Sequence, residues 1–108
     1  MSWIGAAILM LGMEPWAPAR QQADWTELVC NQGYEWPCDE AMAVLWCESR
    51  GAPGAYADGN YGGFQINAIH RHRVGGDLSQ LYVPEVNVRV AHELWREQGW
   101  NPWRACGP

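Results

Sequence analysis

Hydrophobic and polar positions in the middle of the chain follow the spacing of a helix. Ala41, Val44 and Leu45 precede Glu48 by seven, four and three residues, so at helical spacing the four side chains share one face. Gly51 lies where such a helix would stop. The pattern therefore predicts a helix that carries a glutamate in its last turn, on its apolar face.

Two more helices are predicted, one on each side of this one. Asp24, followed three residues later by Glu27, has the spacing of a capping pair and predicts a helix through Cys30. Nearer the C-terminus, Pro84 suits a first helical turn and Gly99 the position just past a helix end. Between them, an apolar stripe is formed by Val86, Val90, Ala91 and Leu94.

A short hairpin is predicted between the second and third helices. Asp58-Gly59-Asn60 has turn chemistry, and residues 61–67 are aromatic and glycine-bearing, which is typical of a strand. We therefore expect an α+β fold, mostly α-helical, in which the glutamate at a helix end faces a short β-hairpin across a cleft. Four tryptophans are expected mainly in the core, namely Trp46, Trp95, Trp100 and Trp103.

Composition narrows the classes of function. The 108 residues suffice for one small domain, which we place at residues 24–108 and expect to be a monomer. A net charge of -5 and the lack of any basic run argue against a nucleic-acid partner. His70 and His72 are separated by one residue, and with His92 distant in the sequence they do not predict a metal site. No cofactor is expected.

The N-terminal segment, residues 1–19, is interpreted as a signal peptide or as an apolar segment of the mature protein. Residues 3–13 are apolar but too few to span a bilayer comfortably, and residues 17–19 have the small-x-small form of a signal-peptidase site. No lysine or arginine precedes them, whereas a secretory signal normally begins with a positive region. Export to a secreted or cell-envelope location is favoured, with no stable membrane span in the mature domain.

Four cysteines, Cys30, Cys38, Cys47 and Cys106, lack the Cys-x-x-Cys spacing that is common in structural zinc sites. Disulfides are the favoured interpretation and would imply an oxidising compartment. Four buried reduced thiols in a cytosolic protein are the alternative. The pairing cannot be deduced from the residues alone.

Glu48 is the strongest candidate for chemistry. Burial on an apolar face disfavours the charged form of a carboxylate and raises its pKa, which suits a group that must hold a proton at neutral pH and donate it. The alternative is a surface carboxylate at a fraying helix end. The apolar neighbours of Glu48 favour the general acid. Ser49 is expected to satisfy backbone groups at the same helix end.

The motifs around Glu48 resemble those of a known family. Glu48 and Ser49, followed by a turn-rich loop and by residues 62–66 (GGFQI), resemble the soluble lytic transglycosylase-type domains of the lysozyme-like superfamily. Residues 84–91 (PEVNVRVA) resemble the family's third motif, and residues 99–106 (GWNPWRAC) resemble the close of small bacterial and phage lysozyme-like domains. The family's Tyr-Asn-Ala-Gly motif has no counterpart. The resemblance covers about residues 25 to 106.

The resemblance implies a lysozyme-like catalytic domain at residues 24–108. It would cleave the β-1,4 bond between N-acetylmuramic acid and N-acetylglucosamine in peptidoglycan glycan strands, with Glu48 as general acid, by hydrolysis or by transglycosylation. It also implies a disulfide between Cys47 and Cys106, which leaves Cys30 and Cys38. The alternatives are a non-catalytic glycan-binding or phage structural module of the same fold, and a small disulfide-stabilised interaction protein.

The other candidate site residues lie in the hairpin. Gln65 matches the family glutamine that contacts the glycan, and bonding within the hairpin is its alternative. Gly62 and Gly63 would let a sugar ring approach the backbone, with a simple turn as the alternative. Tyr61 is expected to line the cleft or to pack across the strands. Asp58 is the candidate for the second carboxylate that glycosidases commonly use, with a turn-forming role as the alternative.

Overall fold

The computed structural model describes residues 23–108 and has an α+β architecture with a small antiparallel sheet. The predictions for residues 1–19 lie outside the described residues. The α-helices are α2 (Trp25–Cys30), α3 (Cys38–Ser49) and α4 (Pro84–Gln98). The 3-10 helices are η2 (Ala68–Val74), η3 (Leu78–Tyr82) and η4 (Asn101–Trp103), and the strands are β1 (Tyr56–Ala57), β2 (Asn60–Tyr61) and β3 (Ile66–Asn67).

The predicted ends of the helices are confirmed. Asp24 caps α2, because its Oδ1 accepts the backbone N–H of Glu27 at 3.1 Å. At the end of α3, the Ser49 hydroxyl donates to the carbonyl of Leu45 and accepts the N–H of Gly51, which is the expected backbone role. The last α-helix, α4, begins at Pro84 and ends just before Gly99.

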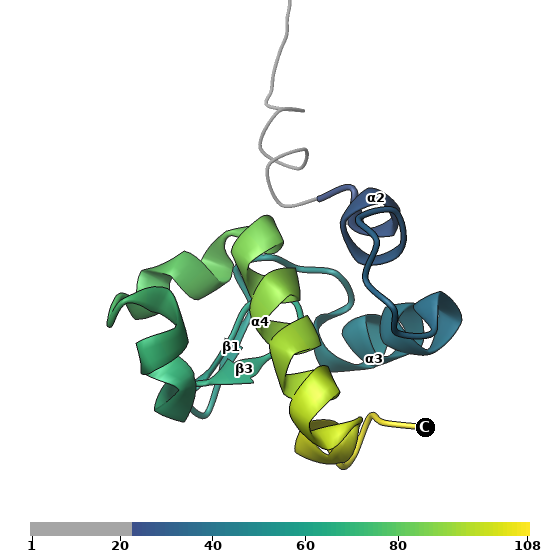
Figure 1. Ribbon diagram of the computed structural model, residues 1–108. Coiled ribbons are helices and arrows are strands. Elements are labelled where there is room, and N and C mark those ends of the chain that lie inside the picture. Colours follow the sequence, from purple (N-terminus) through teal and green to yellow (C-terminus); the bar gives the residue numbers. More distant parts are fainter. Residues whose placement is uncertain (1–22) are drawn as a thin grey trace, which may run out of the picture.

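In Figure 1, α4 runs down the middle of the molecule, with η2 and η3 on one side and α2 and α3 on the other. The apolar stripe of α3 is buried as predicted, and so is most of the stripe of α4. The prediction for Trp46 was wrong. Its side chain is 58% exposed, because the helical rotation that buries Leu45 turns the next residue outward. Trp103 is buried as expected, and Trp95 and Trp100 pack partly buried against the core.

The sheet has the order β1-β2-β3, and both pairings are antiparallel. The turn prediction at residues 58–60 is confirmed, since Asp58 and Gly59 both have positive φ, as a two-residue hairpin turn requires. A single strand over residues 61–67 was the wrong prediction. The chain turns there instead, because Gly62 (φ 76°) and Gln65 (φ 53°) adopt left-handed backbone conformations that end β2 and precede β3.

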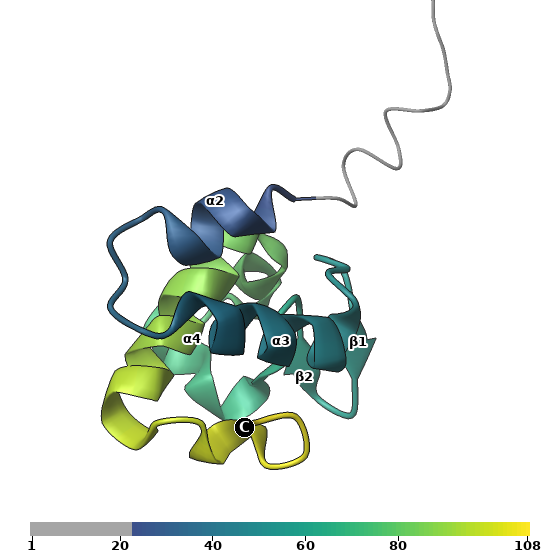
Figure 2. The ribbon, with the colours of Figure 1, turned by 90° about the vertical axis from the view of Figure 1, so that its right-hand side faces the viewer.

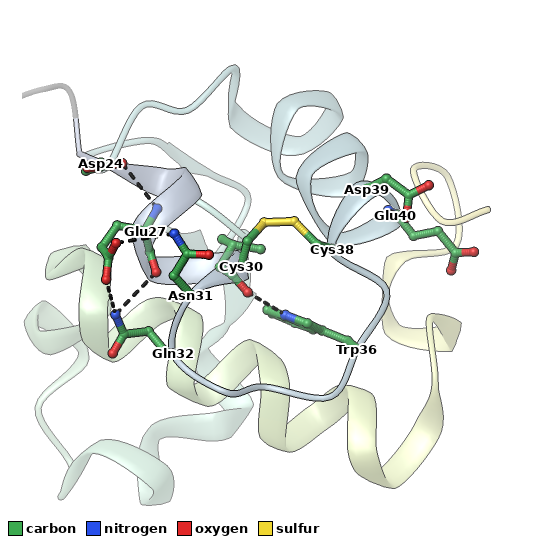
Figure 3. The surroundings of a disulfide bond; sticks show 10 residues. Asp24, Glu27, Cys30, Asn31, Gln32, Trp36, Cys38, Asp39 and Glu40 are labelled. Atoms are coloured by element: carbon green, nitrogen blue, oxygen red, sulfur yellow. Dashed lines mark hydrogen bonds between the residues drawn. A yellow bond between two sulfur atoms is a disulfide. The ribbon is translucent and has the colours of Figure 1, made fainter.

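Two disulfides join the four cysteines. Cys47 bonds to Cys106, as the resemblance implied, and Cys30 bonds to Cys38. The second of these connects the end of α2 to the start of α3, beside the buried ring of Trp36 (Figure 3). Both bonds are compatible with an extracytoplasmic protein.

Within residues 23–108, none of the helices has the length and apolar character needed to cross a membrane.

Candidate functional site

Glu48 lies in the last turn of α3, at the end of the helix that is beside the small sheet in both views (Figures 1 and 2). Leu45, one turn earlier on the same face, has its Cδ1 2.9 Å from the point where a Cβ on Gly63 would stand. The face that carries Glu48 therefore packs on the turn between β2 and β3. Glu48 is half-buried, and this burial raises the pKa of its carboxyl group above the ordinary value.

The two glycines of this turn are buried in the protein interior. A Cβ on Gly62 would stand 2.3 Å from the carbonyl oxygen of Leu81, and one on Gly63 would stand 2.6 Å from Cη2 of Trp25. Both positions therefore exclude any side chain for reasons of internal packing. This is the structural role that was the alternative for these residues, and contact with a glycan stays a prediction.

The turn is held to α4 by Asn87, which was not among the site residues predicted from the sequence. Asn87 is fully buried, and its Nδ2 donates to the carbonyl oxygens of Tyr61 and Leu81, at 2.9 Å each. Its Oδ1 accepts the N–H of Phe64 at 2.7 Å. The signal was present in the sequence, because Asn87 lies three, four and seven residues before apolar positions of the stripe and so shares their face.

A cavity of about 260 Å³ opens between the sheet, η2 and the C-terminal part of the chain. Its polar wall comes from Asn60, Gln65 and Asn67, and its apolar wall includes Leu94 and Trp103. Of the predicted site residues, it is lined by Gln65 and not by Glu48, Tyr61, Asp58 or the two glycines. The complete lining is Asn60, Gln65, Ile66, Asn67, Ile69, His70, Leu94, Gln98, Pro102 and Trp103.

Asn60 and Asn67 are cavity residues that the sequence analysis did not select. They are directly opposite each other in the β2 and β3 register, and Nδ2 of Asn67 donates to Oδ1 of Asn60 at 3.0 Å. Asn67 also caps η2 by accepting the N–H of Ile69. The two-residue period of a strand could not have identified this polar wall, because Gln65 lies at positive φ outside both β2 and β3.

Gln65 holds the hairpin together from within the cavity wall. Its Nε2 donates to the carbonyl oxygens of Ala55 (3.2 Å) and Gly62 (2.9 Å). These bonds stabilise the left-handed backbone of Gln65 and match the hairpin role that was its alternative. Because the residue also lines the cavity, its contact with a glycan stays a prediction.

The remaining two predicted residues have local contacts. The ring of Tyr61 packs edge-on against Tyr56, with centroids 5.1 Å apart, and lies 5.5 Å from that of Tyr82. This is the cross-strand packing that was the alternative to a place in the cleft. Asp58 is exposed, with φ 51° in the turn between β1 and β2, where an aspartate is well tolerated.

The chemistry of the cavity is that of amides, one imidazole and apolar side chains. Among its lining residues, all of which belong to the described part of the chain, none carries a carboxylate. Within residues 23–108, no three histidine, cysteine, aspartate or glutamate side chains come together as metal ligands would. Donors and acceptors next to an apolar floor suit a neutral polar ligand such as a saccharide.

Two features of this region can carry chemistry: the carboxyl group of Glu48 at the end of α3, and the cavity beside the turn between β2 and β3, which Glu48 does not line. Glu48 supplies an acid whose proton is held more tightly than usual, and the cavity supplies hydrogen-bonding groups. No family model, curated protein or solved structure matches this chain.

Proposed function

We propose that the protein is a peptidoglycan-cleaving glycosidase with a lysozyme-like fold, acting on the β-1,4 bond between N-acetylmuramic acid and N-acetylglucosamine. The observation that carries the proposal is the half-buried Glu48 at the end of α3, whose pKa burial raises. A glycosidic oxygen leaves readily only when it is protonated, and a carboxyl group that keeps its proton above its ordinary pKa can supply that proton. The motifs that accompany Glu48 support the same assignment.

In the proposed reaction, Glu48 donates its proton to the bridging oxygen while the bond to the anomeric carbon breaks. The anomeric carbon then has oxocarbenium character and needs a nucleophile. The cavity would hold a neighbouring sugar through Nδ2 of Asn60 as donor and Oε1 of Gln65 as acceptor, because Nε2 of Gln65 already donates to the carbonyl oxygens of Ala55 and Gly62.

Of the two possible outcomes we propose transglycosylation, because it needs no second carboxylate. Hydrolysis with two carboxylates would need a partner for Glu48, yet the cavity wall carries Asn60 and Asn67, and Asp58 is exposed in its turn. In transglycosylation Glu48 is sufficient, because the carboxylate left after proton donation takes the proton of the muramic acid's own hydroxyl. That oxygen bonds to the anomeric carbon, which closes an anhydro-sugar without the addition of water.

The test is mass spectrometry of muropeptides released from purified peptidoglycan by the wild-type protein, by Glu48→Gln and by Glu85→Gln. Glu85 is an exposed carboxylate in the first turn of α4 and serves as the matched control. We expect anhydro-muramic ends from the wild type and from Glu85→Gln, and none from Glu48→Gln.

Other products would assign other functions. Reducing ends one water heavier would indicate a muramidase and would make Asp58 the next residue to test. No soluble product from any of the three proteins would refute the enzyme and favour a glycan-binding or phage structural module, provided that the protein still sediments with peptidoglycan. A secreted or cell-envelope location fits this function and the two disulfides.

A further inference from the structure

His70 lines the cavity from η2, alongside the polar wall that Gln65 and Asn67 form. The helical backbone of η2 is interrupted at this residue, which has φ -91° and ψ 17°. The His70 side chain is partly buried, whereas that of His72, two positions later, is exposed. His70 is therefore the one imidazole among the lining residues of the cavity.

The orientation of the His70 ring is linked to its protonation by Arg73. Nε of Arg73 donates to Nδ1 of His70 at 3.3 Å. A guanidinium group is only a donor, so Nδ1 must be the unprotonated nitrogen of the ring. In a neutral imidazole the hydrogen is then on Nε2.

Arg73 is itself held in place by α4. Its two terminal nitrogens donate to the carboxylate of Glu97 at 2.9 and 2.8 Å, and one of them also donates to Glu93 at 3.3 Å. Such a bidentate pair fixes the plane of the guanidinium group and hence the direction of its Nε–H. A chain of hydrogen bonds thus runs from Glu97 on α4 through Arg73 to His70 at the cavity.

The charged groups that face His70 favour its neutral form. Partial burial lowers the pKa of His70, and the charges of Arg73 and His72 lower it further, while Glu97 opposes them. Near neutral pH the ring therefore offers one donor, Nε2–H, and no positive charge of its own.

We propose that His70 is a glycan-binding residue, whose Nε2–H, held in that tautomer by Arg73, donates a hydrogen bond to an oxygen of an N-acetylhexosamine seated in the cavity. This assignment rests on the proposed function, because it names the ligand class of the same site. The other polar groups of the wall are amides, which can bond the remaining hydroxyl and acetamido groups of the sugar.

The experiment follows the imidazole nitrogens by NMR while the soluble N-acetylglucosamine tetramer is added to the Glu48→Gln protein, which should bind without cleaving. Before addition, we expect the Nε2–H tautomer of His70. On addition, its Nε2 resonance should shift, and those of His72 should not. Calorimetry should show that His70→Phe weakens binding about tenfold, the loss of one well-placed hydrogen bond, whereas the control His72→Phe leaves binding unchanged.

Three results would overturn the proposal. They are an Nδ1–H tautomer in the free protein, equal tetramer affinity for His70→Phe and its parent, and no tetramer binding by a folded protein. The tautomer measurement needs no substitution at His70, so it stands even where His70→Phe fails to fold. The muropeptide assay separates two meanings of a lack of tetramer binding. If muropeptides are still released, only the role of His70 is refuted. If no muropeptides are released either, the glycosidase is refuted as well.

Discussion

Loss of the Asn87 side chain should destabilise the fold strongly, because this buried amide holds the turn between β2 and β3 to α4. Asn87→Ala removes three hydrogen bonds, to the N–H of Phe64 and to the carbonyl oxygens of Tyr61 and Leu81. With about 1 kcal/mol for each bond, and the three backbone groups left buried without this partner, we expect a loss of about 3 kcal/mol in the free energy of unfolding. For a domain of this size, the melting temperature should fall by about 15 °C.

Urea unfolding and calorimetry of the wild type, Asn87→Ala and the exposed control Asn101→Ala measure this loss. A second variant tests the direction of the bonds. Asn87→Asp keeps an acceptor for Phe64 but places a carboxylate oxygen against two carbonyl oxygens, so the folded state should favour the protonated acid. The folded pKa at position 87 then exceeds the unfolded pKa, and stability is present at low pH and lost as pH rises through the folded value.

A cost below about 1 kcal/mol for Asn87→Ala, or a gain in stability of Asn87→Asp as pH rises, would contradict this role of Asn87. Either result would mean that the turn between β2 and β3 does not depend on this side chain.

Three further predictions concern the acid, the turn and the long disulfide. Because burial raises the pKa of Glu48, the rate should fall with rising pH at a midpoint above the ordinary glutamate pKa of about 4.3. An alkaline limb with its midpoint below that value would contradict Glu48 as the general acid. Urea titration should show Gly62→Ala losing about 3 kcal/mol, and the matched Gly75→Ala, also at positive φ but in open space, about 1; equal losses would contradict the packing argument. Replacing both Cys47 and Cys106 by serine should cost up to about 4 kcal/mol by the same titration, since the two residues are 59 positions apart in the sequence, and an unchanged stability would exclude this bond as a stabilising constraint.

The helices could be predicted because their signals are local. The cap at Asp24, the proline at Pro84 and the glycine at Gly99 act on backbone groups a few residues away, and the apolar stripes report directly which face is buried. The half-buried position of Glu48 followed from the same periodicity. These parts of the fold and site were therefore accessible from the chain alone.

The turn and the cavity were not accessible in this way, because they depend on partners far apart in the sequence. Residues 61–67 have a composition that suits a strand, but Gln65 is held at positive φ by a bond to Ala55, and Phe64 is bonded to Asn87. Trp46 was misplaced because aromatic density alone does not tell which side of α3 faces the core. Register and long-range hydrogen bonds decide these points, and periodicity does not encode them.

The Cys47–Cys106 bond has a consequence for proteolysis. It closes a covalent ring that includes the exposed residues 75–77, between η2 and η3. A protease that cuts once there produces two fragments that stay joined, so the nicked molecule separates into two bands only after reduction. Such a cut leaves Glu48 and the cavity-lining part of α4 in one covalent unit, so a nicked preparation migrates as intact protein on a non-reducing gel.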